Sequence, residues 1–187
     1  ACRSPKLARN GTAVAFECGG TPVATQAVQK GAPLPGALVL LYDIAARKLE
    51  TVSRPPGTGA ANGGSQILGL SGNGTQVLFS SDASNLVGGD TNGVTDLYLG
   101  EVGTTVTVRR VASQSNGAQL DAPIDSGAIS ADGNAIAFTT RSSGVDPLAG
   151  GTGTSALYLA SLRGGPARKV RRGTDGGLTG DAGNPAL

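Results

Sequence analysis

The feature that most constrains the fold is a turn followed by an apolar strand, which occurs three times in this sequence. The copies are RNGTAVAF (9–16), GNGTQVLF (72–79) and ADGNAIAF (131–138). Their turn glycines, Gly11, Gly74 and Gly133, are spaced by 63 and 59 residues. Asn-Gly or Asp-Gly between apolar runs is typical of a β-hairpin with a two-residue turn. The sequence therefore predicts an internal repeat of about 60 residues, each copy built around a hairpin.

Each turn is flanked by further short apolar segments. We expect lead-in strands at 5–8, 67–71 and 128–131, Tyr-bearing strands around Tyr42, Tyr98 and Tyr158, and outer strands at 48–54, 105–112 and 167–173. The chain contains 31 Gly and only 3% aromatic residues. Because the apolar runs are short, regularly spaced and compatible with strands, this glycine content indicates tight turns rather than disorder. Each repeat thus predicts four antiparallel strands.

The strand after the turn has apolar residues on both faces. Val77 and Phe79 alternate with Leu78, and a strand of this kind suits a sheet that is covered on both sides. Four antiparallel strands per repeat at this period predict an all-β fold, with each repeat forming one blade of a β-propeller. The three four-stranded blades are expected at about 4–66, 67–126 and 127–184, and 185–187 would start a further repeat.

The segment ISADGNAIAF, Ile129–Phe138, resembles the TolB-type β-propeller repeat. The signature of that repeat is I-S-x-D-G-x-x-[IV]-[AV]-F, followed by a strand that bears Tyr or Phe. The other copies have Asn10 and Asn73 where the family prefers Asp, and SNLVGGDTNGVTDLYL resembles a variant common in secreted bacterial proteins. The resemblance covers nearly the whole chain. It implies a propeller fold, a periplasmic location and a partner at the propeller rim or channel mouth, although such propellers serve many functions.

Three blades are fewer than a propeller ring usually contains, since about 4 to 8 are typical. The outer faces of the first and third blades would then be exposed apolar surface. Two arrangements would cover them. Either two chains associate to complete a six-bladed ring, or this sequence is a partial ring within a longer protein.

Cys2 and Cys18 are expected to form a disulfide. With Asn10-Gly11 as a two-residue turn, the hairpin register places Arg3 opposite Cys18, so that Cys2 lies within reach across the strands. The alternative is a pair of reduced, unrelated thiols. A disulfide here would join the first two strands and implies an oxidising compartment.

The chain starts at Ala1-Cys2 without Met, which we interpret as a processed N-terminus from which a signal peptide has been removed. A lipid-modified Cys2 is the alternative, and the retained Ala1 argues against it, because lipid-modified chains begin at the Cys. No apolar run approaches the roughly 20 residues of a membrane helix. We therefore expect a periplasmic or extracellular protein.

A candidate metal site lies in the loop GDTNGVTD (89–96), where Asp90, Asn92 and Asp96 occupy positions 1, 3 and 7. Oxygen ligands at this spacing can converge on Ca²⁺. However, position 6 is Thr95 rather than Gly, and Glu101 at position 12 lies beyond a full strand, too far to reach the same ion. The alternative is an Asn-Gly turn whose Asx side chains bond to their own backbone.

No catalytic residues are predicted. The sequence has no His, which excludes Ser-His-Asp and Cys-His arrangements. Zinc needs more Cys or His ligands than the two Cys provide, and neither a GxSxG elbow nor a P-loop is present. The net charge of +2 is too small to indicate a nucleic-acid partner.

The sequence therefore predicts a non-catalytic propeller module of the bacterial cell envelope that acts as a protein-binding scaffold. Its partner would be a larger envelope assembly, in which it could be an accessory subunit, or a second chain that completes the ring. Two alternatives stay open. One is the gating or substrate-binding propeller of a larger hydrolase or peptidase. The other is a carbohydrate or small-ligand binder. Sugar-binding sites usually contain Trp or Tyr rings, and a chain with three Tyr and no Trp offers few of them, which disfavours this alternative.

Overall fold

The structure is a computed structural model that describes residues 1–19, 36–57, 59–146 and 154–170. These residues form three antiparallel four-stranded sheets, in each of which the spatial order of the strands follows the sequence. The all-β prediction is thus confirmed. In the described ranges no helix is long and apolar enough to cross a membrane. The predicted start of a further repeat at 185–187 lies outside the described residues.

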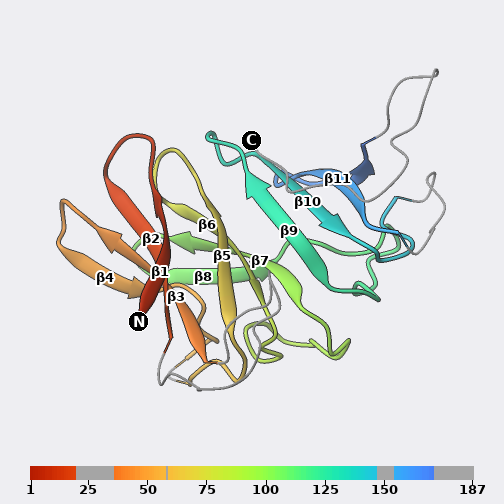
Figure 1. The fold of residues 1–187 in the computed structure, drawn as a ribbon, viewed down its shortest axis with the longest axis horizontal. Coiled ribbons are helices and arrows are strands. Elements are labelled where there is room, and N and C mark those ends of the chain that lie inside the picture. Colours follow the sequence, from red (N-terminus) through yellow and green to blue (C-terminus); the bar gives the residue numbers. More distant parts are fainter. Residues whose placement is uncertain (20–35, 58, 147–153, 171–187) are drawn as a thin grey trace.

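The strands are short, as the Gly-rich turns between them require. Sheet 1 contains β1 (Cys2–Leu7), β2 (Ala13–Gly19), β3 (Ala37–Asp43) and β4 (Lys48–Thr51). Sheet 2 contains β5 (Ser65–Leu70), β6 (Gln76–Ser81), β7 (Asp96–Val102) and β8 (Val106–Arg110). Sheet 3 contains β9 (Ile124–Ile129), β10 (Ala135–Thr140), β11 (Ala156–Ser161) and β12 (Arg168–Lys169). Figure 1 shows the sheets side by side in chain order, from red and orange through yellow and green to blue.

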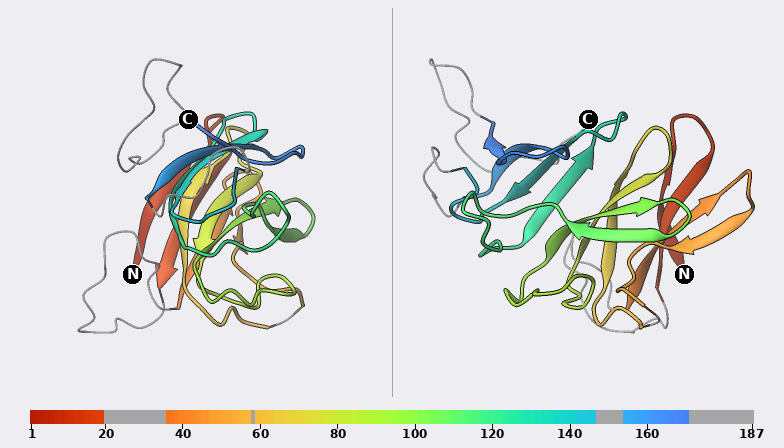
Figure 2. Two further views of the ribbon diagram at one scale, coloured as in Figure 1. Left: turned by 90° about the vertical axis from the view of Figure 1, so that its right-hand side faces the viewer. Right: turned by 180° about the vertical axis from the view of Figure 1, so that it is seen from behind.

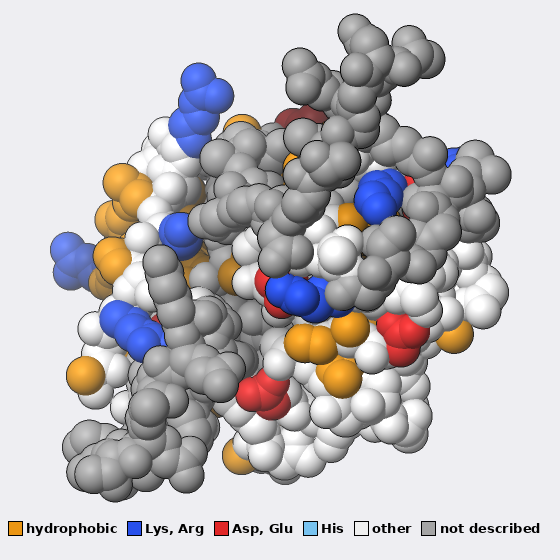
Figure 3. Space-filling view, turned by 45° about the vertical axis from the view of Figure 1, so that its right-hand side comes forward, with side chains coloured by type: hydrophobic (Ala, Val, Ile, Leu, Met, Phe, Trp, Pro, Cys, Tyr) orange, Lys and Arg blue, Asp and Glu red, His pale blue; other side chains and the backbone are white. Residues whose placement is uncertain are grey.

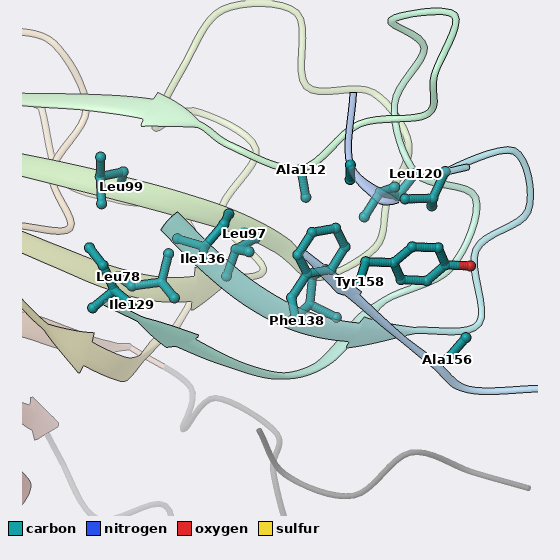
Figure 4. Packing of buried hydrophobic residues seen from close by; sticks show 13 residues of the cluster. Leu78, Leu97, Leu99, Ala112, Leu120, Ile129, Ile136, Phe138, Ala156 and Tyr158 are labelled. Carbon is teal, nitrogen blue, oxygen red and sulfur yellow. The ribbon is translucent and has the colours of Figure 1, made fainter. Parts of the chain in front are cut away.

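Sheet 2 lies between the other two sheets, as the right-hand view of Figure 2 also shows. One of its faces packs on sheet 1 in a cluster that contains Val77, Phe79, Tyr98, Ala15, Val39 and Leu41. The other face packs on sheet 3 in a cluster that contains Leu78, Leu97, Leu99, Ile129, Ile136 and Phe138. Figure 4 shows Leu78 and Ile129 side by side in this second cluster. The predicted alternation along β6 is therefore confirmed, and both faces of its sheet are covered.

The hairpin turns differ from the prediction in length. In the first turn, residues 9–12 connect the strands, because the N–H of Ala8 donates to Ala13 O and the N–H of Gly11 donates to Ala8 O, both at 2.9 Å. The predicted two-residue turn is wrong. The longer loop is stabilised by the Asn10 side chain, which accepts the N–H of Thr12 at 3.0 Å. Gly11 closes the β-turn with a φ of 72°, a conformation that glycine adopts without strain.

The second and third turns have the same construction. The N–H of Gly74 donates to Ser71 O at 3.0 Å, and that of Gly133 donates to Ser130 O at 2.9 Å. The turns are also joined from sheet to sheet. The N–H of Asn10 donates to Gly72 O at 3.1 Å, and the N–H of Gly72 donates to Ala131 O at 2.8 Å. The stacking of the sheets is therefore reinforced by backbone hydrogen bonds between their turns.

The first strand contains a bulge that changes the predicted register. Lys6 lies opposite Ala15, but Arg3 lies opposite Glu17, so β1 has one extra residue between them. Ser4 has a φ of 56°, and the following Pro5 cannot donate a ladder hydrogen bond, so the pairing is interrupted at this point. The bulge moves Cys2 directly opposite Cys18 instead of Arg3. The predicted disulfide between Cys2 and Cys18 is present, with a Cα–Cα distance of 4.1 Å.

Candidate functional site

The loop that precedes β7 brings the predicted metal-site residues close together. The hydroxyl of Tyr98 donates to Oδ2 of Asp90 at 2.6 Å. The side-chain amide of Asn92 donates to both carboxylate oxygens of Asp96, at 3.1 and 3.2 Å. Arg110 on the neighbouring strand β8 forms an ion pair with Asp96, with 3.1 Å between Nη1 and Oδ2. Asp90, Asn92 and Asp96 therefore belong to one polar network at the edge of sheet 2.

Burial controls the ionisation of this network. It raises the pKa of the Asp96 carboxyl above its usual value and outweighs the opposite effects of the Asn92 hydrogen bond and the Arg110 charge. Burial also raises the pKa of the Tyr98 hydroxyl, and the hydrogen bond to Asp90 adds to this effect. Tyr98 therefore stays protonated and donates its hydrogen bond to Asp90, as expected for a phenol whose ionised form would be desolvated beside a carboxylate.

A residue that the sequence did not single out fixes the loop to the segment before sheet 3. Oε1 of Gln119 accepts the backbone N–H groups of Thr91 and Asn92, at 3.1 and 3.2 Å. Its amide nitrogen donates to Gly89 O at 2.8 Å. No sequence pattern marks Gln119, because it stands in a connecting segment outside the repeated strands. The contact joins a loop of sheet 2 to the connection that leads to sheet 3.

The orientation of the Asn92 side chain affects whether this loop could bind a cation. Asn92 directs its amide nitrogen, a donor, toward Asp96, while Oδ1 of Asn92 accepts the N–H of Val94 at 3.4 Å. The second contact is the Asx turn that was the alternative to a metal site. In the described ranges, no group of three or more His, Cys, Asp or Glu side chains could hold a metal ion. Calcium binding at Asp90, Asn92 and Asp96 stays a prediction, and an unchanged melting temperature after addition of a chelator would contradict it.

A groove of about 990 Å³ opens beside this network, between sheets 2 and 3. It is lined by Arg109 and Arg110 of β8, by residues 111–113 and 117–121 of the segment that follows, and by Ser161, Leu162, Gly164 and Gly165 at the end of β11 and beyond it. Nη2 of Arg109 reaches Leu162 O at 3.4 Å across the groove. The Arg110 charge is compensated by Asp96, so among the described residues that line the groove Arg109 is the cation that forms no ion pair.

Asp121, which also lines the groove, is bound by residues of the loop after β10. Its carboxylate accepts hydrogen bonds from the hydroxyls of Ser142 and Ser143 and, at 2.9 Å, from the N–H of Ser143. These bonds lower the pKa of the Asp121 carboxyl. A carboxylate stabilised in this way is a poor general base. Asp121 therefore stabilises the loop that follows β10 in sheet 3.

Glu17 is a second polar residue that the sequence interpretation missed. Its side chain is 1% exposed and lies between sheets 1 and 2. Oε2 accepts from Nε of Arg3 at 2.8 Å, and Oε1 accepts the N–H of Ile67 on β5 at 3.0 Å. The repeat contained a signal for this site, because Ser80 and Thr139 are also polar at the position that corresponds to Glu17.

Similarity to known proteins is found among solved structures. No family model matches the sequence, and no curated protein matches it. Among solved structures, the chain is similar to one from a structural and mechanistic study of two prolyl endopeptidases and their inter-domain dynamics. The TM-score is 0.49 at 12% sequence identity, and the match covers 90% of this chain but only 21% of that chain. A similarity at this level assigns neither a family nor an activity.

Proposed function

We propose that this chain is a non-catalytic β-propeller module, of the TolB-like type that its repeat resembles, and that it acts by binding protein partners. The observation that carries the proposal is the repeated packing of one four-stranded sheet on the next through the same strand positions. The first strands of the sheets support the propeller arrangement, because β5 contacts both β1 and β9. In a propeller, the corresponding strand of every blade lies nearest the common axis.

The chemistry of the groove favours binding over catalysis. The acidic residues beside it are engaged, since Asp96 is paired with Arg110 and Asp121 accepts three hydrogen bonds from Ser142 and Ser143. The sequence contains no His to act as a base at neutral pH. What the groove presents is Arg109 with backbone and amide groups, which suits the acidic or polar side chains of a protein surface. We place the partner there.

The location is part of the same proposal. The disulfide between Cys2 and Cys18 is compatible with an oxidising compartment, and we assign the module to the bacterial periplasm or the extracellular space. In such a compartment the module would act as a scaffold within a larger envelope assembly.

The proposal is tested by photo-crosslinking in the periplasm of a bacterium that exports the chain. A photoreactive residue in place of Ala118, an exposed residue that lines the groove, is expected to give a discrete adduct with a partner protein. The same residue in place of Thr104, exposed on the turn between β7 and β8, is the matched control and is expected to give none. Equal adducts at both positions would contradict the groove as the binding site. Turnover of peptide or glycoside substrates by the purified, metal-free chain would overturn the non-catalytic assignment.

A further inference from the structure

The outer face of sheet 1 carries an apolar row that crosses all four strands. The register pairs Leu7 with Val14, Val14 with Tyr42, and Tyr42 with Leu49. Leu7 is 67% exposed and Leu49 is 55% exposed, whereas Val14 and Tyr42 are half-buried. Figure 3 shows hydrophobic side chains among basic ones along its left-hand margin, the side on which sheet 1 lies in Figure 1. In the described part of the chain, no sheet packs on this face.

Sheets 2 and 3 contain the same row, and in both of them a preceding sheet covers it. The row of sheet 2 consists of Leu70, Val77, Gly100 and Val108. Its apolar side chains belong to the cluster shared with sheet 1. In sheet 3, Ile129, Ile136 and Ala160 take these positions and pack on sheet 2. The row that is exposed on sheet 1 is therefore equivalent to rows that are buried against a neighbouring sheet in sheets 2 and 3.

The outer face of sheet 3 is equivalent to the face of sheet 2 that packs on the following sheet. Its row consists of Ala128, Ala137, Leu159 and Arg168, of which Leu159 is 45% exposed and the small side chain of Ala137 only 1%. The corresponding row of sheet 2 consists of Gly69, Leu78, Leu99 and Arg109. Leu78 and Leu99 of that row pack on sheet 3. Sheet 3 therefore presents outward the type of face that, elsewhere in the chain, receives the next sheet.

The outer faces of sheets 1 and 3 also differ from their counterparts in sheet 2 in a complementary way. Tyr42 stands where sheet 2 has Gly100, so the outer face of sheet 1 carries the larger side chain. Ala137 stands where sheet 2 has Leu78, so the outer face of sheet 3 carries the smaller one. Large side chains opposite small ones allow two layers to interdigitate. The size changes therefore compensate each other if these two faces meet.

We propose that the sheet 1 face of one chain packs on the sheet 3 face of a second copy, head to tail. This inference rests on the proposed propeller arrangement. Because the two faces are unlike, the contact is heterologous, and heterologous contacts either close into rings or form open filaments. The described residues of two chains supply six sheets, within the range of about 4 to 8 that closed propellers use, whereas those of one chain supply three and those of three chains nine. The assembly is a closed dimer with two identical contacts.

The first measurement is the native mass of the complete chain by light scattering over a range of concentrations. The expected result is a species of twice the 18.3 kDa chain mass, with no larger species. A monomer at every concentration would overturn the dimer while leaving the sheet packing and the proposed function untouched. A series of species that grows with concentration would overturn ring closure.

The second measurement compares Leu49→Glu on the sheet 1 face with Leu159→Glu on the sheet 3 face. Both side chains are about half exposed, so the single chain is expected to fold, which circular dichroism and the melting temperature of the diluted variants verify. Each substitution places a charge in both contacts of the dimer and is expected to weaken dimerisation at least ~10-fold. Thr104→Glu, on the exposed turn between β7 and β8 of sheet 2, is the matched control and is expected to dimerise normally.

Mixing the two variants distinguishes head-to-tail pairing from symmetric pairing. A mixed dimer of the Leu49→Glu and Leu159→Glu chains contains one undamaged contact, so association is expected to recover partly on mixing. If Leu159→Glu dimerises normally and mixing restores nothing, the contact joins two sheet 1 faces and the proposal is wrong. Normal dimerisation of both variants would contradict the assigned faces as well.

Discussion

Sheets 1 and 2 have the same strand order and the same rows of side chains, yet only sheet 2 is covered on both faces. Phe79 and Phe16 occupy equivalent positions after the turn. Phe79 is fully buried against sheet 1 and stacks on Tyr98 with ring centroids 5.6 Å apart, whereas Phe16 is half-buried on an open face. The difference lies in the neighbour and not in the strand. In a chain of stacked sheets, burial is decided by what packs next to each repeat.

Sheet 1 contains a disulfide, which sheet 2 lacks. The bond between Cys2 and Cys18 joins β1 to β2, although every residue of β1 is exposed. Both sheets have a buried carboxylate in an ion pair, Glu17 with Arg3 in sheet 1 and Asp96 with Arg110 in sheet 2. Sheet 2 relies instead on close approach to sheet 1. A Cβ at Gly100 would lie 2.2 Å from Cγ1 of Val52. One sheet is therefore held by a covalent bond and the other by its fit between two layers.

The largest expected effect comes from truncating the two phenylalanines in turn. Phe79→Ala removes a fully buried ring and is expected to lower the free energy of unfolding by about 3–5 kcal/mol. Phe16→Ala is expected to cost about 1–2 kcal/mol, because much of its apolar surface is already in contact with water. Urea unfolding of both variants, at concentrations where the chain is monomeric, measures the difference. Equal losses would show that sheet 1 is covered in solution by something other than a second copy.

Removal of the disulfide is expected to have the next largest effect. The two cysteines are 16 residues apart, and a closed loop of this size contributes roughly 3 kcal/mol to stability. Cys2→Ser combined with Cys18→Ser is therefore expected to lower the melting temperature, and a reductant should lower it similarly in the natural sequence. Hydrogen exchange locates the effect, which we expect to appear first in β1 and β2. Loss of protection in β6 before β2 would contradict the assignment of the disulfide to sheet 1.

Gly100→Ala tests the close approach between the sheets. The added methyl group would overlap Val52 and is expected to cost about 1–3 kcal/mol, which is typical of overpacking in a core. Gly19→Ala is the matched control, since its Cβ would meet nothing within 4 Å and its φ is not in the left-handed region. Thermal unfolding of both variants measures the difference. If Gly100→Ala were as stable as Gly19→Ala, sheets 1 and 2 would be packed more loosely than the structure shows.

The smallest effect concerns the turns and appears only in acid. Hydrogen bonds from Ser130, and from the backbone and side chain of Asn134, lower the pKa of Asp132 from 3.8 to about 2. A lowered carboxyl pKa stabilises the folded state above the unfolded value, and this contribution is lost as the pH falls from about 4 through about 2. Asp132→Asn is expected to remove that part of the pH dependence and to change little at pH 7.

Sheet 2 supplies the matched control for the acid effect. Asn73 occupies the position of Asp132 and accepts the same type of bonds, from the hydroxyl of Ser71 and the N–H of Thr75. Asn73→Asp is expected to introduce the pH dependence that Asp132→Asn removes. Melting temperatures between pH 2 and pH 7 measure both. A variant of Asn73 that shows no acid dependence would contradict the equivalence of the two turns.

Much of the fold could be predicted because it depends on short-range patterns. The turn glycines, the alternation of Val77, Leu78 and Phe79, and the reach of Cys2 to Cys18 all follow from the order of neighbouring residues. The predictions of turn length and strand register were wrong where the same residues could form two different local structures. Asn10 stabilised a four-residue connection in place of a two-residue turn, and Ser4-Pro5 inserted a bulge that shifted Arg3 from Cys18 to Glu17. Both errors concern hydrogen bonds that a hydrophobic pattern does not encode.

The candidate site was less predictable for the same physical reason. The spacing of Asp90, Asn92 and Asp96 indicated that polar groups would gather in one loop, and they do. Spacing could not show that Arg110 would pair with Asp96 or that Gln119 would hold the loop from the connection before sheet 3. Those partners come from segments distant in sequence. Their contacts exist only once sheets 2 and 3 have packed.

The sequence by itself determined the repeat, the four strands of each unit and the two apolar faces of the strands, because turns and alternation are properties of adjacent residues. Only the tertiary structure decided which apolar faces are buried, since burial depends on a neighbouring sheet that no single repeat contains. It also decided that Glu17 would be enclosed and that the row through Leu7 and Leu49 would stay open. The same row is core in sheet 2 and surface in sheet 1, because water is excluded only where a second layer is present.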